Sequence, residues 1–352
     1  MSVAWSIRNA RPDDENEVLA LLARAHADDE TGTPSGEEWR WLFLENPAGR
    51  GLQYVVADAG ERLAGQYATV PMRLQIRGQA AAGLLSLNTA TDPDFQRQGI
   101  FTALASRLYE EAAGEFAVVY GFPNPRSAPG FYRRLDWRDL GSPRLLVRPL
   151  RAPGRSFERR RTAAALAVAA PPLNALVRLR RASSKVIPID SFGPWADAVW
   201  ARAAPALGTA AIRDAAFLTW RFDAAPRYYR RWAFIGDDGE PVGYAVSRVV
   251  EWRSESLAYL MELQAPSAHA ASALLQAVVA DAHSSGAIAL CTVVTQRSPH
   301  RRSFAAAGLL PLPAGIARYA SFGARTLGHD VPADAVLDQR AWYISPADFD
   351  WI

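Results

Sequence analysis

The stretch "TATDPDFQRQGIFTALASRLYEEA", residues 89–112, decides the fold because it joins a strand pattern to a helix pattern. Residues 84–87 before it are mostly leucine, which is typical of a short buried strand. Within it, Ile100, Leu104 and Leu108 recur at the spacing of one helix face. A polar loop with one glycine lies between the two patterns, so the stretch predicts a strand, a loop and a helix in that order.

The composition predicts a folded protein of two domains. The chain has 352 residues, of which 49% are hydrophobic, and a single cysteine, Cys291, which excludes an internal disulfide. The first residues lack the basic and apolar regions of a signal peptide. The apolar run 162–177 is short and is broken by Pro171 and Pro172, so no membrane span is expected. These features predict a cytoplasmic protein.

Positive charge gathers in one segment although the net charge is only +3. Residues 151–181 hold eight arginines against one acid, Glu158. We interpret residues 151–185 as an Arg-rich connector between two more balanced halves.

Four landmarks occur twice, in the same order, which indicates an internal repeat. The pairs are 37–49 with 216–226, 55–70 with 233–249, 83–93 with 257–266, and 116–137 with 288–310. Turn residues near Gly60 and Gly239 predict antiparallel pairing early in each copy, and the later strand–helix–strand segments predict a parallel crossover. The sequence therefore predicts an α+β fold with two mixed sheets, in domains 1–150 and 186–352.

The loop before the helix has the features of an anion site. The first turn of a helix carries free backbone N–H groups, and Gly99 removes a Cβ from their path. Gln96 and Arg97 add polar and charged donors. Counted from Pro93 and Pro266, the second copy has other residues at these places, so we expect the first copy's loop to serve a ligand. Those residues are His269, Ala270 and Ser272.

The loop "QRQGIF", residues 96–101, resembles the acyl-CoA pyrophosphate loop of GNAT acetyltransferases, whose pattern is Gln/Arg-x-x-Gly-x-Gly/Ala. Gln96 and Gly99 match the pattern, while Phe101 departs from its last position. The resemblance implies two tandem GNAT-like mixed-sheet domains with the acyl-CoA N-acyltransferase fold, the first intact and the second degenerate.

The segment "NPRSAPGFYRRLDW", residues 124–137, resembles a second GNAT motif. Asn124 matches the asparagine that contacts the pantetheine arm, and Tyr132 matches the tyrosine near the thiol, with one extra residue before it. The second copy has Phe304 at the tyrosine's place, without a hydroxyl. The resemblance therefore assigns reactivity to the first copy.

The resemblance implies that an amine attacks the thioester of acetyl-CoA, or another acyl-CoA, with Tyr132 as the general acid. Glu45 is the predicted general base, and the alternatives are Glu37, Glu38, Asp92 and the terminal carboxylate of Ile352. Amides between Leu87 and Thr91 are expected to hold the thioester. The predicted residues that bind the co-substrate are Thr89, Thr91, Gln96, Arg97, Gln98, Gly99, Phe101, Thr102 and Asn124.

Two other interpretations remain open at this stage. An aminoacyl-tRNA-dependent acyltransferase would use the Arg-rich connector to contact RNA phosphates, and Phe101 in the loop favours it. A binding or regulatory protein would carry two decayed copies. The five histidines are scattered without ligand spacing, so no metal site is expected. The leading prediction is an N-acyltransferase acting on the amine of a small metabolite, while its oligomeric state stays open.

Overall fold

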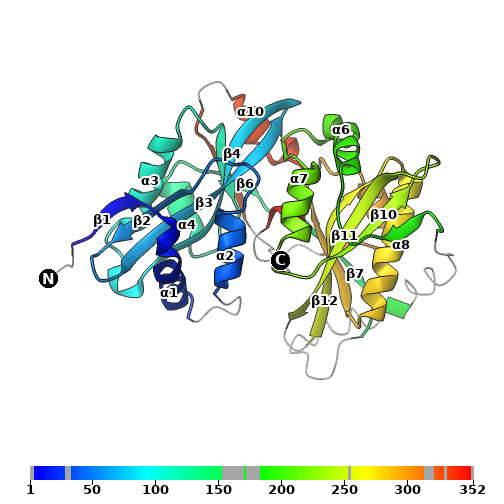
Figure 1. Ribbon diagram of the computed structural model, residues 1–352, viewed down its shortest axis with the longest axis horizontal. Coiled ribbons are helices and arrows are strands. Elements are labelled where there is room, and N and C mark those ends of the chain that lie inside the picture. Colours follow the sequence, from blue (N-terminus) through cyan, green and yellow to red (C-terminus); the bar gives the residue numbers. More distant parts are fainter. Residues whose placement is uncertain are drawn as a thin grey trace. The chain divides into compact units, whose positions relative to one another are not determined.

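The computed structural model describes residues 4–27, 33–152, 170–171, 183–252, 255–312, 321–328 and 331–349. The chain forms two compact units (Figure 1). The first unit contains Met1–Ser142 and Ala320–Ala341, and the second contains Pro143–Tyr319 and Trp342–Asp350.

The first unit is a mixed sheet in the order β1-β2-β3-β4-β5-β15-β6, with β4 and β5 parallel and the other neighbours antiparallel. Its strands are β1 (Ser6–Asn9), β2 (Gln53–Asp58), β3 (Leu63–Ile76), β4 (Gln79–Thr91), β5 (Val118–Gly121), β6 (Arg138–Gly141) and β15 (Phe322–Thr326). Its helices and helical turns are η1 (Pro12–Asp14), α1 (Glu15–Ala25), α2 (Gly36–Phe43), η2 (Pro93–Phe95), α3 (Ile100–Ala112), α4 (Ala128–Arg134), α10 (Ala333–Val336) and η4 (Gln339–Ala341).

The second unit repeats this arrangement in the order β14-β7-β13-β12-β11-β10-β8, with β12 and β13 parallel. Its strands are β7 (Arg144–Pro149), β8 (Val186–Pro188), β9 (Ala210–Ala211), β10 (Arg230–Ile235), β11 (Pro241–Trp252), β12 (Glu255–Gln264), β13 (Ala289–Val294) and β14 (Leu310–Pro311). Its helices and helical turns are α6 (Trp195–Leu207), α7 (Ala215–Leu218), η3 (Thr219–Asp223), α8 (Ala268–Ser284), α9 (Arg301–Ala306) and η5 (Pro346–Asp348).

Strands β7 and β15 each pair within the sheet that is built mainly by the other half of the sequence, and we call them the exchanged strands. Strand β15 pairs with β5 and β6 in the first sheet, and β7 pairs with β13 and β14 in the second. The compact units therefore differ from the expected continuous domains 1–150 and 186–352. Sequence patterns along the chain locate strands, but the partner of a strand depends on tertiary pairing.

The predicted helix after the loop is α3, and its apolar face enters the core of the first unit. Ile100, Leu104 and Leu108 are 1%, 0% and 2% exposed and pack against residues of β2, β3 and β4. No helix within the described ranges is both long enough and apolar enough to cross a membrane.

Candidate functional site

The candidate site begins where two parallel strands of the first unit stop pairing. The pairing of β4 with β5 runs from Gly83 opposite Val118 to Ser86 opposite Gly121. Strand β4 then continues through residues 87–91, where only β3 is its partner. This leaves a stretch of β4 backbone open on its β5 side, which we call the β4 edge.

A β-bulge lies within the β4 edge. Ala68 faces Leu87 and Gln66 faces Ala90, so β4 carries one additional residue between these pairs. Asn88 adopts a left-handed backbone with φ 46°, and its carbonyl accepts a hydrogen bond of 2.6 Å from Gln66 Nε2. The bulge changes the direction of nearby backbone amides, which the sequence predicted as the thioester site.

Two buried polar atoms at the bulge find no hydrogen-bond partner in the described part of the chain. They are Thr89 Oγ1 and Gln66 Oε1. A buried polar atom without a partner is costly, so such atoms call for a further ligand group or water. A hydroxyl donor at the β4 edge fits the carbonyl and amide groups of a pantetheine arm.

The loop before α3 has the backbone of an anion site. Arg97 and Gly99 have left-handed φ values of 63° and 82°, and residues 96–99 are exposed. The first helical bond joins the Ala103 amide to the Gly99 carbonyl at 3.0 Å, so the preceding amides have no helical acceptor. The first turn of α3 contains no acid. Exposed N–H groups at such a helix start favour phosphate oxygens.

The backbone conformation of the turn itself requires glycine at position 99, whether or not a ligand binds there. A Cβ built there would meet nothing within 4 Å, so space is not the constraint, whereas the φ of 82° disfavours any other residue.

The second unit lacks this loop, and the expected match of its residues was wrong. Ser267 caps α8 directly after Pro266 by accepting a hydrogen bond from the Ala270 amide. Helix α8 therefore begins at Ala268, while α3 begins seven residues after Pro93. The residues that counting from the prolines aligned with the loop lie inside α8 instead. They are His269, Ala270 and Ser272.

The structure explains why Phe101 departs from the GNAT pattern. Its ring lies 5.1 Å from the Phe131 ring and 6.0 Å from the Tyr67 ring, measured between centroids. The side chain thus joins the aromatic core between α3 and α4, while its backbone amide stays in the first turn of α3.

Asn124 shapes the start of α4. Its Oδ1 accepts hydrogen bonds from the amides of Arg126 at 3.0 Å and Ser127 at 2.9 Å. The carbonyl end of the carboxamide is therefore committed to the turn. The Nδ2 end supplies the donors with which the predicted pantetheine contact would be made.

Tyr132 lies half-buried on α4 and contacts strand β15. Its hydroxyl forms a hydrogen bond of 2.5 Å with Ser321 Oγ, which is 189 residues away in the sequence. Burial raises the pKa of Tyr132 above its usual value and Asp139 raises it further, whereas the Ser321 hydrogen bond lowers it. The phenol is therefore protonated at neutral pH, as a general acid must be. No sequence pattern indicated Ser321 or Asp139, because both act through the pairing of β15 with β6.

A buried chain of hydrogen bonds underlies the site. Ser86 Oγ donates to Tyr67 at 3.0 Å, Tyr67 and Tyr109 share a bond of 2.6 Å, and Trp137 Nε1 donates to Tyr109 at 2.8 Å. This chain joins Ser86, the last residue of β4 that pairs with β5, to Trp137, which lies three residues beyond the end of α4, so it connects the two sides of the site.

The predicted general bases lie in different surroundings. Glu45 is exposed just after α2, and none of the contacts between described residues joins it to Tyr132. Asp92 is 1% exposed and pairs with Arg24 at 2.7 Å, which gives it a structural role beside η2. Glu38 caps α2 with Ser35.

The remaining predicted residues border the same region or lie outside the described ranges. Thr91 ends β4 opposite Gly65, Thr102 is in the first turn of α3, and Gln96 and Gln98 are exposed in the loop. Ile352 lies outside the described residues.

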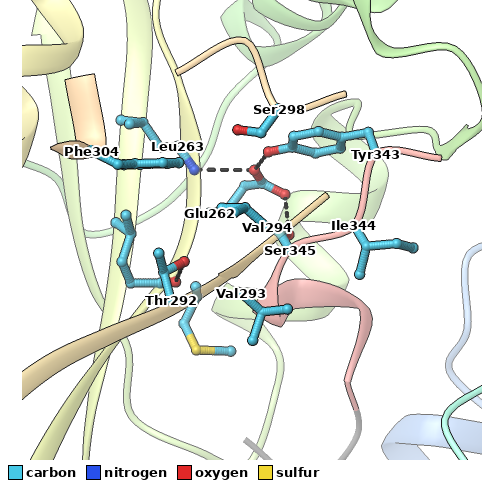
Figure 2. A pocket seen from close by; sticks show the side chains of 12 residues that line it. Glu262, Leu263, Thr292, Val293, Val294, Ser298, Phe304, Tyr343, Ile344 and Ser345 are labelled. Carbon is cyan, nitrogen blue, oxygen red and sulfur yellow. Dashed lines mark hydrogen bonds between the residues drawn. The ribbon is translucent and has the colours of Figure 1, made fainter. Parts of the chain in front are cut away.

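The equivalent region of the second unit is a small pocket whose lining includes Tyr343, Ile344 and Ser345 (Figure 2). Strand β12 also carries a bulge, since Ser247 faces Leu260 and Val246 faces Glu262. The Glu262 carboxylate accepts a hydrogen bond from the Leu263 amide at 3.0 Å. It also accepts hydrogen bonds from the side chains of Arg213 at 2.9 Å, Ser345 at 2.8 Å and Tyr343.

Tyr343 and Ser345 therefore lie at the bulge of β12, where the first unit has the open β4 edge. Phe304 lines this pocket and is 4% exposed, and it has no hydroxyl to donate. The second copy thus keeps the fold of the first but lacks its loop, its tyrosine and its open edge.

The Arg-rich connector is largely outside the described residues, which include only 151–152, 170–171 and 183–185 of it. Arg151 donates to the His283 carbonyl at 2.9 Å. In the described part of the chain, no three His, Cys, Asp or Glu side chains gather as a metal site would require.

Comparisons with known proteins agree with this geometry. Residues 6–139 match the family model for the acetyltransferase (GNAT) domain. No curated protein matches the chain.

Solved structures share the fold along most of the chain. A GCN5-related N-acetyltransferase from Anabaena variabilis has a TM-score of 0.63 at 15% identity, and the match covers 92% of this chain and 73% of that one. A conserved protein from Enterococcus faecalis, described as a probable N-acyltransferase, has a TM-score of 0.61 at 14% identity with the same coverage. A GCN5-related N-acetyltransferase from Kribbella flavida has a TM-score of 0.59 at 13% identity, covering 92% and 71%.

These matches and the geometry of the first unit lead to one conclusion. Residues 6–139 match the acetyltransferase (GNAT) domain model, and the chain, with its two mixed sheets of the same strand order, shares the fold of GCN5-related N-acetyltransferases.

Proposed function

We propose that the first unit transfers an acetyl group, or another acyl group, from acyl-CoA to the amine of a small metabolite. The backbone of the loop before α3 carries this proposal, because Arg97 and Gly99 hold exposed amides at a helix start without acids. The family match at residues 6–139 supports acyl transfer as the reaction type. The name of the Anabaena protein, an N-acetyltransferase, points the same way.

The acyl-CoA donor is proposed to extend from the loop before α3, along the β4 edge, to Tyr132. The phosphates would accept hydrogen bonds from the loop amides, and the pantetheine arm would follow the β4 edge toward Asn124 Nδ2. The thioester would lie at the bulge, where Thr89 Oγ1 has no partner among the described residues. Tyr132 would stand at the sulfur.

The reaction then needs one bond to form and one to break. The amine nitrogen attacks the thioester carbonyl carbon, the C–N bond forms, and the C–S bond breaks. The thiolate takes the phenolic proton of Tyr132, and the nitrogen gives its extra proton to a base, for which Glu45 stays our candidate. Orientation of the amine against the thioester supplies most of the rate enhancement.

Calorimetric titration with acetyl-CoA tests the donor site. Gly99→Glu places a carboxylate and a strained backbone where the phosphates would lie, so binding is expected to fall at least about a hundredfold. Gly114→Glu is the matched control, because Gly114 follows the other end of α3, has φ 83°, and also has nothing within 4 Å of a built Cβ.

Three outcomes separate the possibilities. Binding that is lost in Gly99→Glu and kept in Gly114→Glu supports the proposal. No binding of acetyl-CoA or other acyl-CoA by the unmodified chain overturns it. Salt-sensitive binding of tRNA without acyl-CoA binding would instead favour the RNA-dependent alternative, whose connector lies largely outside the described residues.

A further inference from the structure

The contact between Tyr132 and Ser321 suggests a role for the exchanged strand β15 in the first unit's chemistry. We infer that Ser321 is a positioning residue that holds the Tyr132 phenol and directs its proton toward the leaving sulfur. The inference rests on the proposed acyl transfer and adds to it a residue from the far end of the chain.

The backbone around Ser321 is held firmly by the first sheet. Phe322 is fully buried, stacks on Phe122 with ring centroids 5.3 Å apart, and pairs with Gly141 of β6. Gly323 pairs with both Gly121 and Asp139. The Ser321 hydroxyl is therefore presented from the start of a paired strand.

The ring of Tyr132 is fitted to the same strand. A Cβ built on Gly323 would lie 2.8 Å from Tyr132 Cε1 and 3.0 Å from its hydroxyl oxygen. Only the missing side chain of Gly323 lets the phenol lie this close to β15. The hydrogen bond to Ser321 Oγ then sets the position of the hydroxyl along the strand.

The direction of this hydrogen bond decides what Ser321 does. When Tyr132 gives its proton to the thiolate, its oxygen becomes negative, and Ser321 Oγ–H then donates to it. The bond thus stabilises the phenolate and leaves the phenolic proton free for the sulfur. The tyrosine regains a proton from water after the thiol departs.

Charged groups near the phenol act differently from Ser321. Asp139 on β6 opposes formation of the phenolate. Arg133 and Arg134 on α4 are exposed. Arg325 on β15 donates to the Leu135 carbonyl at 2.9 Å and lies over the Tyr109 ring. Among these groups, Ser321 is the one whose side chain forms a hydrogen bond with the Tyr132 hydroxyl.

Three variants of the full chain test the inference. Ser321→Ala removes the hydroxyl, Ser321→Thr restores one, and Ser142→Ala makes the same change at an exposed position outside the site. The readouts are the titration of Tyr132, followed by ¹³C NMR of ring-labelled tyrosine, and the pH profile of kcat with acetyl-CoA and an amine panel. The Tyr132 signal is assigned by its loss in Tyr132→Phe.

Ser321→Ala is expected to raise the Tyr132 titration midpoint, because a hydrogen bond that favours the phenolate is lost. The alkaline limb of kcat moves to higher pH with it, and kcat near neutral pH falls about threefold to tenfold. Ser321→Thr returns both values toward those of the unmodified chain, and Ser142→Ala leaves both unchanged.

An unchanged Tyr132 midpoint and an unchanged kcat in Ser321→Ala overturn the inference. A shifted midpoint with an unchanged kcat also overturns the role in catalysis. Absence of both acyl-CoA binding and transfer in the unmodified chain overturns the proposed function, while the NMR titration still reports separately whether Ser321 bonds to Tyr132.

Discussion

At the scale of single residues, the first unit's site depends on close approach between side chains from distant parts of the sequence. Gly323 lies beneath both Tyr132 and Trp137, and a Cβ there would lie 3.0 Å from Trp137 Cε3. Trp137 in turn donates to Tyr109 in the buried chain of hydrogen bonds. A methyl group at position 323 would therefore displace the candidate acid and its support together.

Gly323→Ala is expected to reduce the free energy of unfolding by about 1–3 kcal/mol, because the added methyl overpacks this contact. Urea denaturation measures the change. Gly328→Ala is the control, since its built Cβ meets the nearest atom, Val331 Cγ2, at an ordinary 3.4 Å. Equal stability of the two variants would contradict this account of Gly323.

The motif residues could be predicted from the sequence because each follows a local pattern. Gln96, Gly99 and Asn124 lie within short segments that resemble the family, and the structure places them in the loop before α3 and at the start of α4. Ser321 carries no such pattern. Its importance comes from β15 pairing beside β6, and a single sequence does not indicate that register.

At the scale of elements, both units contain a bulged strand next to a parallel partner, but the segments around the bulge differ. The apolar spacing of α3 predicted a helix, and the structure confirms it from Ile100 onward. The length of the loop before it was not predictable by counting from a proline, because Ser267 caps α8 at once in the second unit.

The second unit replaces an open edge with a buried ionic cluster of Arg213, Glu262 and Asp348. Arg213 bonds to Glu262 at 2.9 Å and to Asp348 at 2.7 Å, and all three side chains are at most 1% exposed. Burial raises the pKa of Asp348, and Arg213 opposes that rise. The cluster fixes η5 against β12.

Arg213→Met leaves two buried carboxylates without their cation, so the free energy of unfolding at neutral pH is expected to fall by about 3–5 kcal/mol. The pKa of Asp348 then rises further, and protonation favours the folded state. The deficit therefore shrinks as the pH falls through that raised pKa. Urea denaturation at several pH values measures it.

The control for this prediction is Arg340→Met. Arg340 forms an ion pair with Asp338, and its side chain is 72% exposed. An ion pair exposed to solvent in this way contributes little to the free energy of unfolding. The interpretation of the cluster fails if Arg213→Met loses no more stability than this control, or if its deficit is the same at every pH.

At the scale of the whole molecule, the repeat predicted from four landmarks appears as two sheets of the same strand order. The landmarks indicated which elements recur, since apolar spacing and turn residues follow local structure. They did not indicate that β7 and β15 are exchanged, because a local pattern identifies a strand but not the strand with which it pairs. What differs is the sheet that each of these two strands joins, and no local sequence pattern records that.

Neither of the fragments 1–152 and 153–352 is expected to fold without the other. The first lacks β15 and the second lacks β7, so each sheet alone has a gap beside its parallel pair. Co-expression with a tag on one fragment should purify both, and separate expression should give aggregated material or no cooperative unfolding. Fragment 1–152 alone with a cooperative transition and the acetyl-CoA affinity of the full chain would contradict this expectation.

The exchanged strand β15 also delays completion of the first sheet while the chain is being synthesised. Strands β5 and β6 emerge from the ribosome long before residues 322–326, which lie between them in the finished sheet. At about 5–20 residues per second, the nascent chain spends on the order of 10–40 s with that position empty. Unpaired strand edges invite association with other chains during such an interval. The first half of this protein is thus expected to rely on chaperones until nearly all of the polypeptide has been made.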